Sequence, residues 1–217
     1  LQQRYRKSGW LKSIGKGAML KSGDPLLLSG ALAALQSQAN SNIHLGGRSA
    51  LELNGIAHYL RLATPEATLF TFGKTKLRSW FVNNKWDVDY KLFKISLFKN
   101  DAVGLIDYRD AEINMKVSSI GRAMLECLSL CPDEFSLSEA YELMESLSTL
   151  RPKQVQELLD ECKSIKAKRL FLYFGKKLLH IRLRPPLPDL MIFLNQKKPL
   201  VLLYLCHFAS HFSPSQF

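Results

Sequence analysis

The side chains with the clearest potential for chemistry lie in the first 21 residues of the chain. Six cations and several amides occur there before the first acid, Asp24. Lys and Arg bind DNA phosphates with release of counterions, whereas Arg and Gln can each make two hydrogen bonds to the edges of guanine and adenine. The candidate DNA-contacting residues are Gln2, Gln3, Arg4, Arg6, Lys7, Lys12, Lys16 and Lys21.

A helix and a hairpin are needed to present these side chains. Residues 1–8 fit a helix that ends at Gly9, since glycine is common just past a helix end. Gly15-Lys16-Gly17 lies between two apolar stretches and predicts a hairpin over residues 10–21. A basic helix followed by a β-wing is how a winged helix-turn-helix approaches DNA.

That fold also needs two helices before the recognition helix, so we expect a truncated winged helix in residues 1–23. A basic amphipathic terminus is the alternative. The charge of the segment alone does not decide between the two.

The charge is distributed unevenly along the 217 residues, whose formal net charge is +11. Residues 1–99 hold 15 Lys and Arg against 5 Asp and Glu, whereas residues 100–175 hold 9 against 13. This asymmetry indicates that one part of the chain meets a polyanion and another does not. A solvated basic surface is the alternative. The 47% of hydrophobic residues is typical of a globular protein.

Neither a leader nor a membrane span is expected, because Leu1 leads directly into charge and no apolar run reaches about 20 residues. The four cysteines form no CxxC pair and no zinc pattern with the histidines, so we expect no metal and no cofactor. Cys127 and Cys131 fit one face of a helix as small core residues, with a redox pair as the alternative. This cysteine usage is typical of the cytoplasm.

Two groups of carboxylates have the residue types of a metal-dependent enzyme. Asp87 and Asp89 have the spacing of a Mg²⁺-binding pair, but no Gly-Ser helix start precedes them, and we expect a turn. A second group has the residue types of a nuclease site but not the spacing of one, so we expect a solvated loop there. This group comprises Asp107, Asp110, Glu112 and Lys116.

The remaining candidates are two histidines and a glycine pair. His44 and His58 have no Ser or Cys nucleophile in a recognisable elbow. Gly46 and Gly47 precede a predicted helix, whose free N–H groups attract anions, and Arg48 is the candidate anion contact there. A tight strand-to-helix turn explains the same glycines. The sequence predicts no enzyme.

Behind the hairpin, apolar spacing predicts a mixture of helices and strands. Asp24 is the predicted N-cap of a helix that Pro25 opens, and Ser136 with Glu139 predicts a capping box. Predicted helices cover residues 24–35, 48–60, 77–82, 118–128, 136–147, 152–162 and 164–174, and predicted strands cover residues 43–45, 67–72, 90–98 and 113–117. This order is α+β, with a mixed α/β part followed by a helical cluster.

Residues 24–175 are expected to form one domain, and residues 176–217 a separate tail. The tail has one acid, five prolines and no clear period. A divergent or frame-shifted tail and a native tail that docks on the body both stay open.

A longer pattern decides between the alternatives for the N-terminal segment. It comprises Trp10-Leu-x-x-Ile-Gly-Lys-Gly17, Gly23-Asp24-Pro25, Gly30-Ala-Leu-x-Ala-Leu-Gln36, His44-Leu-Gly-Gly-Arg-Ser-Ala-Leu-Glu-Leu-x-Gly-Ile-Ala-His-Tyr-Leu60, Leu77-Arg-Ser-Trp80, Ser118-Ser-x-x-Arg-Ala-Met-Leu-Glu126, Leu150-Arg-Pro152 and Lys166-Ala-Lys-Arg-Leu-Phe-Leu-Tyr173. Over residues 1–174 this pattern resembles the AbiEi antitoxin family of type IV (abortive-infection) toxin–antitoxin pairs.

The resemblance implies an N-terminal winged helix that represses the shared operon, and a larger C-terminal domain that carries antitoxicity. It also implies a nucleotidyltransferase-like toxin as the functional partner, without a stable complex. The chain departs from the family pattern at the front of the winged helix and after Gly175.

We therefore predict a cytoplasmic, non-enzymatic antitoxin that binds double-stranded operator DNA at inverted repeats and represses its own operon, with no membrane partner. The alternative is a protein-interaction domain whose acidic helices neutralise a toxin without DNA binding. A metal-dependent nucleic-acid enzyme is the third hypothesis, and it predicts Mg²⁺-dependent turnover that Asp87→Asn abolishes.

Overall fold

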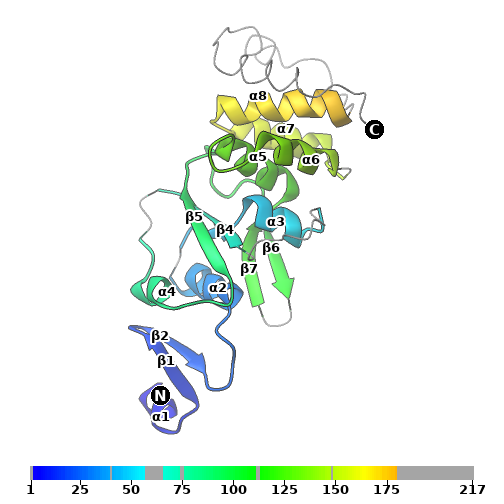
Figure 1. Ribbon diagram of the computed structural model, residues 1–217. Helices are drawn as coiled ribbons and strands as arrows, with labels where there is room; N and C mark the ends of the chain where they lie inside the picture. Colours follow the sequence, from blue (N-terminus) through cyan, green and yellow to red (C-terminus); the bar gives the residue numbers. More distant parts are fainter. Residues whose placement is uncertain are drawn as a thin grey trace.

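The computed structural model describes residues 2–39, 41–56, 66–73, 76–110, 113–147 and 149–179, without the side chains of Gln2, Lys177 and Leu179. Figure 1 shows an elongated molecule, with a helix and hairpin at one end, a sheet in the middle and a helical cluster at the other end. This arrangement confirms the predicted α+β class. His58, Glu112 and the tail from residue 180 lie outside the described residues.

The N-terminal end consists of α1 (Gln2–Lys7) and an antiparallel hairpin of β1 (Leu11–Gly15) and β2 (Ala18–Lys21). Gly9 has φ +76° and Gly17 has φ +81°, backbone conformations that side-chain-bearing residues resist. These two glycines let the chain leave α1 and close the hairpin, as predicted.

The middle of the molecule is a five-stranded mixed sheet in the order β5-β4-β3-β7-β6. Its strands are β3 (His44–Leu45), β4 (Glu66–Thr71), β5 (Asp89–Lys94), β6 (Leu105–Asp110) and β7 (Ile113–Ser118). The central strand, β3, has only two residues and pairs antiparallel with β4 and parallel with β7. It joins the parallel pair β4–β5 to the antiparallel pair β6–β7.

One face of the sheet is covered by α2 (Leu28–Gln38) and α4 (Ser79–Asn83). Leu32 of α2 and Phe81 of α4 are buried with Leu69 and Val117 of the sheet in one hydrophobic core. Side chains alternate along a strand, so Phe70 points the opposite way from Leu69 and enters a second core.

The second core holds α3 (Gly47–Leu53) and the helical cluster. The cluster comprises α5 (Ile120–Leu130), α6 (Leu137–Glu145), α7 (Pro152–Glu161), α8 (Ile165–Phe174) and the short π-helix η1 (Gly175–Leu179). α5 is buried along almost its whole length because α3, α6, α7 and α8 all contact it. Cys127 and Cys131 lie in this core as buried free thiols. Among the described helices, none is long and apolar enough to span a bilayer.

The predicted start of α2 at Asp24 is wrong. α2 begins at Leu28, and the Leu28 N–H donates to Asp87 Oδ1 at 2.7 Å. A carboxylate from the loop between α4 and β5 therefore caps this helix. Sequence spacing could not reveal the acceptor, because it lies 59 residues further along the chain.

The predicted capping box of α6 forms only in part. Ser136 Oγ accepts a hydrogen bond from the Ser138 N–H, but Glu139 pairs with Arg48 instead of returning to the helix start. The predicted loop around Asp107 and Asp110 is also wrong, because both residues lie on β6. Most of β6 is exposed, as suits a strand at the edge of a sheet, and its apolar pattern is too weak to predict it.

Candidate nucleic-acid interface

The helix and hairpin at the N-terminal end present the predicted DNA-contacting residues to solvent. Gln3, Arg4, Arg6 and Lys7 lie on α1 with exposed side chains, and Gln2 begins the same helix. Lys12 lies on β1, Lys16 in the hairpin turn and Lys21 at the end of β2, and all three are exposed.

Backbone hydrogen bonds hold α1 against the base of the hairpin. The Trp10 N–H donates to the Tyr5 carbonyl at 3.0 Å, and the Ser22 N–H donates to the Trp10 carbonyl at 2.8 Å. α1 and the two strands are thus joined in one structural unit, which carries the cations of both the helix and the hairpin.

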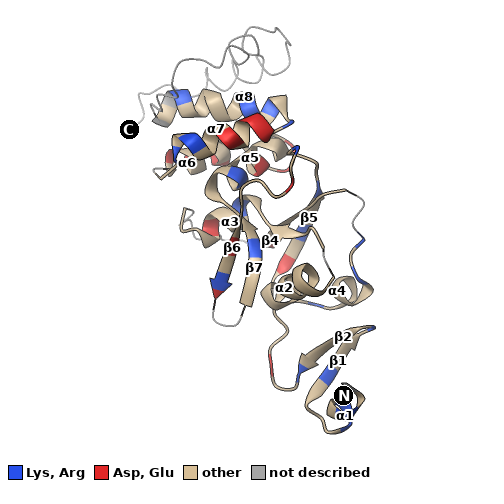
Figure 2. Ribbon diagram, turned by 180° about the vertical axis from the view of Figure 1, so that it is seen from behind, with Lys and Arg blue, Asp and Glu red and all other residues tan. Residues whose placement is uncertain are grey.

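Among the described residues, no acid neutralises the charge of this unit. No acid occurs between residues 2 and 23, and these cations form no ion pair with the residues that the structure describes. Figure 2 shows only Lys and Arg among the coloured residues of α1 and the hairpin, whereas the helical cluster at the opposite end carries Asp and Glu together with Lys and Arg. An uncompensated cationic surface of this kind attracts the phosphates of a nucleic acid.

The hairpin rests on α4 through one small contact. Asn84 Nδ2 donates to the Ile14 carbonyl of β1 at 2.7 Å and also to the Trp80 carbonyl. Beside it, Gly15 lies so close to Trp80 that a Cβ on Gly15 would come within 2.7 Å of the Trp80 Cβ. Next to this contact lies a cavity of about 360 Å³, which is lined by residues of the hairpin together with Leu26 and Asn84.

Arg48 is surrounded by carboxylates of the chain itself. Its Nε donates to Glu52 at 2.9 Å, and its Nη1 donates to Glu139 of α6. The guanidinium is therefore already paired, and it lies far from the basic N-terminal unit. Arg48 therefore lies outside the candidate DNA interface.

The start of α3 does hold an anion, but that anion is a side chain of the protein. The Gly47 N–H donates to Glu126 Oε2 at 2.9 Å, and Gly46 is so close that an added Cβ would meet the same oxygen at 2.4 Å. Both functions considered for the glycine pair are present together: a tight strand-to-helix turn and an anion at a helix N-terminus.

Glu126 is the centre of a buried polar network between the sheet and α5. His44 Nε2 donates to Glu126 Oε1 at 3.0 Å, Arg122 Nε donates to the same oxygen at 2.9 Å, and Ser118 Oγ donates to both oxygens. Arg122 also donates to the carbonyls of Asp101 and Val103. His44, Ser118, Arg122 and Glu126 are each at most 4% exposed.

The network fixes the charge of Glu126. Burial by itself raises the pKa of this carboxyl group, but the hydrogen bonds and positive charges of His44 and Arg122 outweigh burial and hold the pKa at about 2. An ionised carboxylate with this many donors holds β3, β7, α3 and α5 together. His44 is a strand residue, as predicted, and its burial in this network indicates a structural role.

The nuclease-like and Mg²⁺-like carboxylates are spread over separate elements. Asp87 caps α2, and Asp89 begins β5. Asp107 of β6 lies directly opposite Lys116 of β7 on the exposed edge of the sheet. Within the described ranges no group of three or more His, Cys, Asp or Glu residues is placed to hold a metal ion.

Two important residues were missed by the sequence-based reasoning. Asn84 sits in a polar stretch without periodicity, and its partner lies 70 residues away. Glu126 stands four residues after Arg122, and a helical salt bridge on the surface is the usual meaning of that spacing. The signal available for Glu126 was its place on an otherwise apolar helix, where a carboxylate needs buried donors.

Two family models match the chain. Residues 1–62 match the N-terminal domain of transcriptional regulators of the AbiEi antitoxin type, and residues 64–183 match the model of the transcriptional regulator, AbiEi antitoxin, of type IV toxin–antitoxin systems. The RV2827C protein from Mycobacterium tuberculosis has a similar structure, with a TM-score of 0.50 and 14% identity over 82% of this chain and 68% of that chain. At this identity the likeness shows the fold alone. No curated protein matches the chain.

Proposed function

The chain belongs to the AbiEi antitoxin family of type IV toxin–antitoxin transcriptional regulators, and on that premise we propose that residues 1–23 form its operator-contacting surface. α1 enters the major groove, where Gln2, Gln3, Arg4 and Arg6 meet base edges. The remaining cations of this surface bind phosphates on either side; they are Lys7, Lys12, Lys16 and Lys21.

The observation that supports this proposal is the uncompensated charge on one compact unit. A helix and a wing with six exposed cations and no acid have the electrostatic footprint of a DNA-binding element. The helical cluster at the far end of the molecule holds nine Lys and Arg against nine Asp and Glu over residues 120–179, so the excess of positive charge that attracts DNA lies at the N-terminal end.

The rest of the chain carries the antitoxin activity in this proposal. Residues 24–175 form the antitoxin body, which acts in the cytoplasm without catalysing a reaction. The partner is a nucleotidyltransferase-like toxin that is neutralised without a stable complex. A reading frame for such a toxin directly beside this gene supports the pairing, and an unrelated neighbour counts against it.

Operator binding tests the proposed surface directly. We would measure the affinity of the full chain for a duplex that covers the promoter of its own operon, at several salt concentrations, by fluorescence anisotropy. The triple variant Arg4→Ala/Arg6→Ala/Lys16→Ala is expected to bind roughly 100-fold more weakly, because each lost base or phosphate contact costs about a kcal/mol or more. The slope of log affinity against log salt should also fall by about one for each phosphate contact removed.

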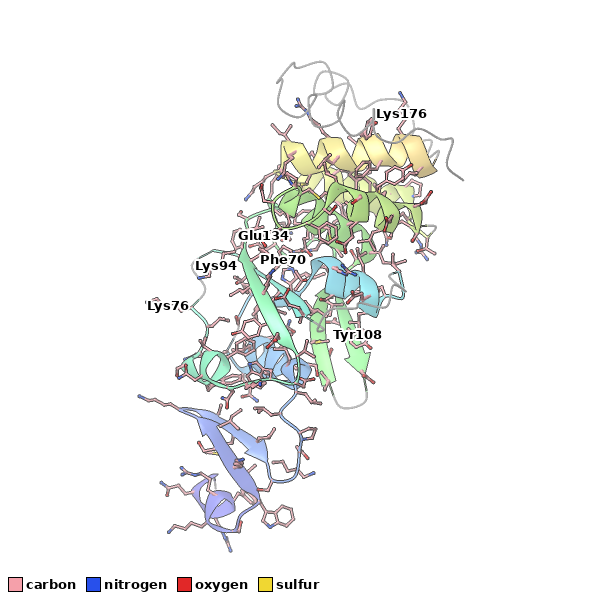
Figure 3. The ribbon with its side chains drawn as sticks, viewed as in Figure 1. Phe70, Lys76, Lys94, Tyr108, Glu134 and Lys176 are labelled. Carbon is pink, nitrogen blue, oxygen red and sulfur yellow. The ribbon has the colours of Figure 1, made fainter. Side chains whose placement is uncertain are left out.

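A matched control removes the same charge elsewhere. Arg151, Lys153 and Lys176 are exposed cations at the helical end of the molecule, where Figure 3 labels Lys176. Their triple Ala variant should bind the operator about as well as the unmodified chain. Equal losses in the two variants would mean that net charge, and not the N-terminal surface, governs binding.

A further inference from the structure

The hairpin that carries the wing lysines is held in place by the part of the chain that matches the second family model. β1 lies within residues 1–62, whereas Trp80 and Asn84 lie within residues 64–183. Asn84 donates to the Ile14 carbonyl at 2.7 Å, and Gly15 packs directly on Trp80. The contact therefore joins the two parts of the chain.

This contact lies next to the residues that the proposed interface uses. Ile14 and Gly15 end β1, and Lys16 follows them at the tip of the hairpin. A carbonyl that is held at position 14 fixes the direction in which the tip leaves the body. The neighbouring cavity of about 360 Å³ shows that the hairpin is not packed tightly along this side, so a small contact has a large share in its placement.

Asn84 is chemically suited to this role because its own position is fixed. The same amide donates to the Trp80 carbonyl of α4, so the side chain bridges helix and hairpin. Trp80 in turn packs edge-on against Phe81 and Trp86, and both of these are buried in the core between α2, α4 and the sheet. A rigid base thus lies directly under the wing.

We propose that α4 supports the DNA-binding wing and that Asn84, just after α4, is the residue that positions it. Operator affinity then depends on a side chain that does not contact DNA. This inference rests on the proposed function. It adds that the antitoxin body determines the position of the wing and hence how well Lys16 meets a phosphate. A wing that is fixed in advance loses less conformational freedom on binding than a loose one.

The variant Asn84→Asp tests this inference in the full chain. It keeps the size of the side chain but replaces the donor by a carboxylate, which cannot donate to the Ile14 and Trp80 carbonyls. Operator affinity should fall about tenfold, as expected for loss of a hydrogen bond that orders the wing. The control is Asn54→Asp, because Asn54 Nδ2 also donates to a backbone carbonyl, that of Ala50 at 2.6 Å, but at the C-terminal end of α3 and away from the wing.

A double-mutant cycle with Lys16→Ala separates positioning from general damage. In the Asn54→Asp background Lys16→Ala should lower affinity as much as in the unmodified chain. In the Asn84→Asp background it should lower affinity by less than about twofold, because the displaced wing has already lost its phosphate. Additive effects of Asn84→Asp and Lys16→Ala would overturn the inference.

The outcomes also distinguish this inference from the proposed function. If Lys16→Ala alone leaves operator binding unchanged, the proposed DNA surface fails. If Lys16→Ala weakens binding but Asn84→Asp does not, only the role of α4 fails. If Asn84→Asp does not fold, Gly15→Ala gives the same test from the hairpin side of the contact. The added Cβ collides with Trp80, and the Gly15 φ of +151° disfavours a side chain.

Discussion

At the scale of single residues, one buried carboxylate orders the middle of the molecule. Glu126 accepts hydrogen bonds from the side chains of His44, Arg122 and Ser118 and from the backbone of Gly47. These donors come from two strands and two helices, so a single charged group fixes how four elements meet. Breaking a buried pair of this kind leaves an uncompensated charge, which costs more than the pair contributes when intact.

Removal of the Glu126 charge should destabilise the fold at neutral pH. Glu126→Gln leaves Arg122 buried without a counter-charge, and the free energy of unfolding at pH 7 should fall by about 3–5 kcal/mol. Urea unfolding followed by tryptophan fluorescence measures this change. Glu142→Gln, an exposed change on α6, is the control and should alter the unfolding free energy by less than about 0.5 kcal/mol.

The same residue predicts a pH dependence with a definite sign. The pKa of Glu126 is about 2 in the folded chain, below its ordinary value of 4.5, so the ionised group stabilises the fold above pH 4.5. That contribution is lost as the pH falls from 4.5 towards 2. Stability measured over this window should fall more steeply for the unmodified chain than for Glu126→Gln, and parallel curves would contradict the assignment.

At the scale of elements, the sequence predicts what is local and misses what is made by distant partners. Glycine chemistry and apolar spacing predicted α1, the hairpin and α7 from neighbouring residues. The start of α2 depends on a partner 59 residues away, and the His44 and Gly47 donors lie 82 and 79 residues from Glu126, distances that no local pattern contains. Within the candidate site the cations were predictable from composition, but Asn84 was not, because its importance comes from the carbonyl that it meets.

The cap of α2 gives a test at this scale. Asp87→Ala removes the carboxylate that accepts from the Leu28 N–H and should lower the free energy of unfolding by about 1 kcal/mol, the usual value for a helix N-cap. Asp24→Ala, at the position that the local pattern favoured, should have little effect because Asp24 is exposed and lies outside the helix. Chemical denaturation of the two variants side by side decides which aspartate caps the helix.

At the scale of the whole molecule, the excess of positive charge lies at one end. The basic unit of residues 2–23, which has no acid, is separated by the sheet from the helical cluster, where Lys and Arg balance Asp and Glu in number (Figures 1 and 2). Such a separation allows two activities to be located on different surfaces of one chain. It also gives the means to distinguish an antitoxin that binds DNA from an interaction domain that does not.

Repression and neutralisation should therefore be separable by mutation. The Arg4→Ala/Arg6→Ala/Lys16→Ala variant is expected to lose repression of a promoter–reporter fusion while it still rescues growth of cells that express the neighbouring toxin gene. The physical reason is that the substituted side chains are exposed and lie at the end opposite to the helical cluster. If the unmodified chain neutralises the toxin but never represses the promoter, the interaction-domain alternative is correct.

The position of the two-residue strand β3 has a consequence for how the chain folds. β3 belongs to residues 1–62, yet it lies between β4 and β7 of residues 64–183 and supplies His44 to the interior. A break between the two family-matched parts would leave β4 and β7 with facing, unpaired edges and an open slot between them, and such edges recruit other chains. We infer that the two parts are not separate folding units. Residues 1–62 complete their fold only once residues 64–183 have been synthesised and supply β4 and β7.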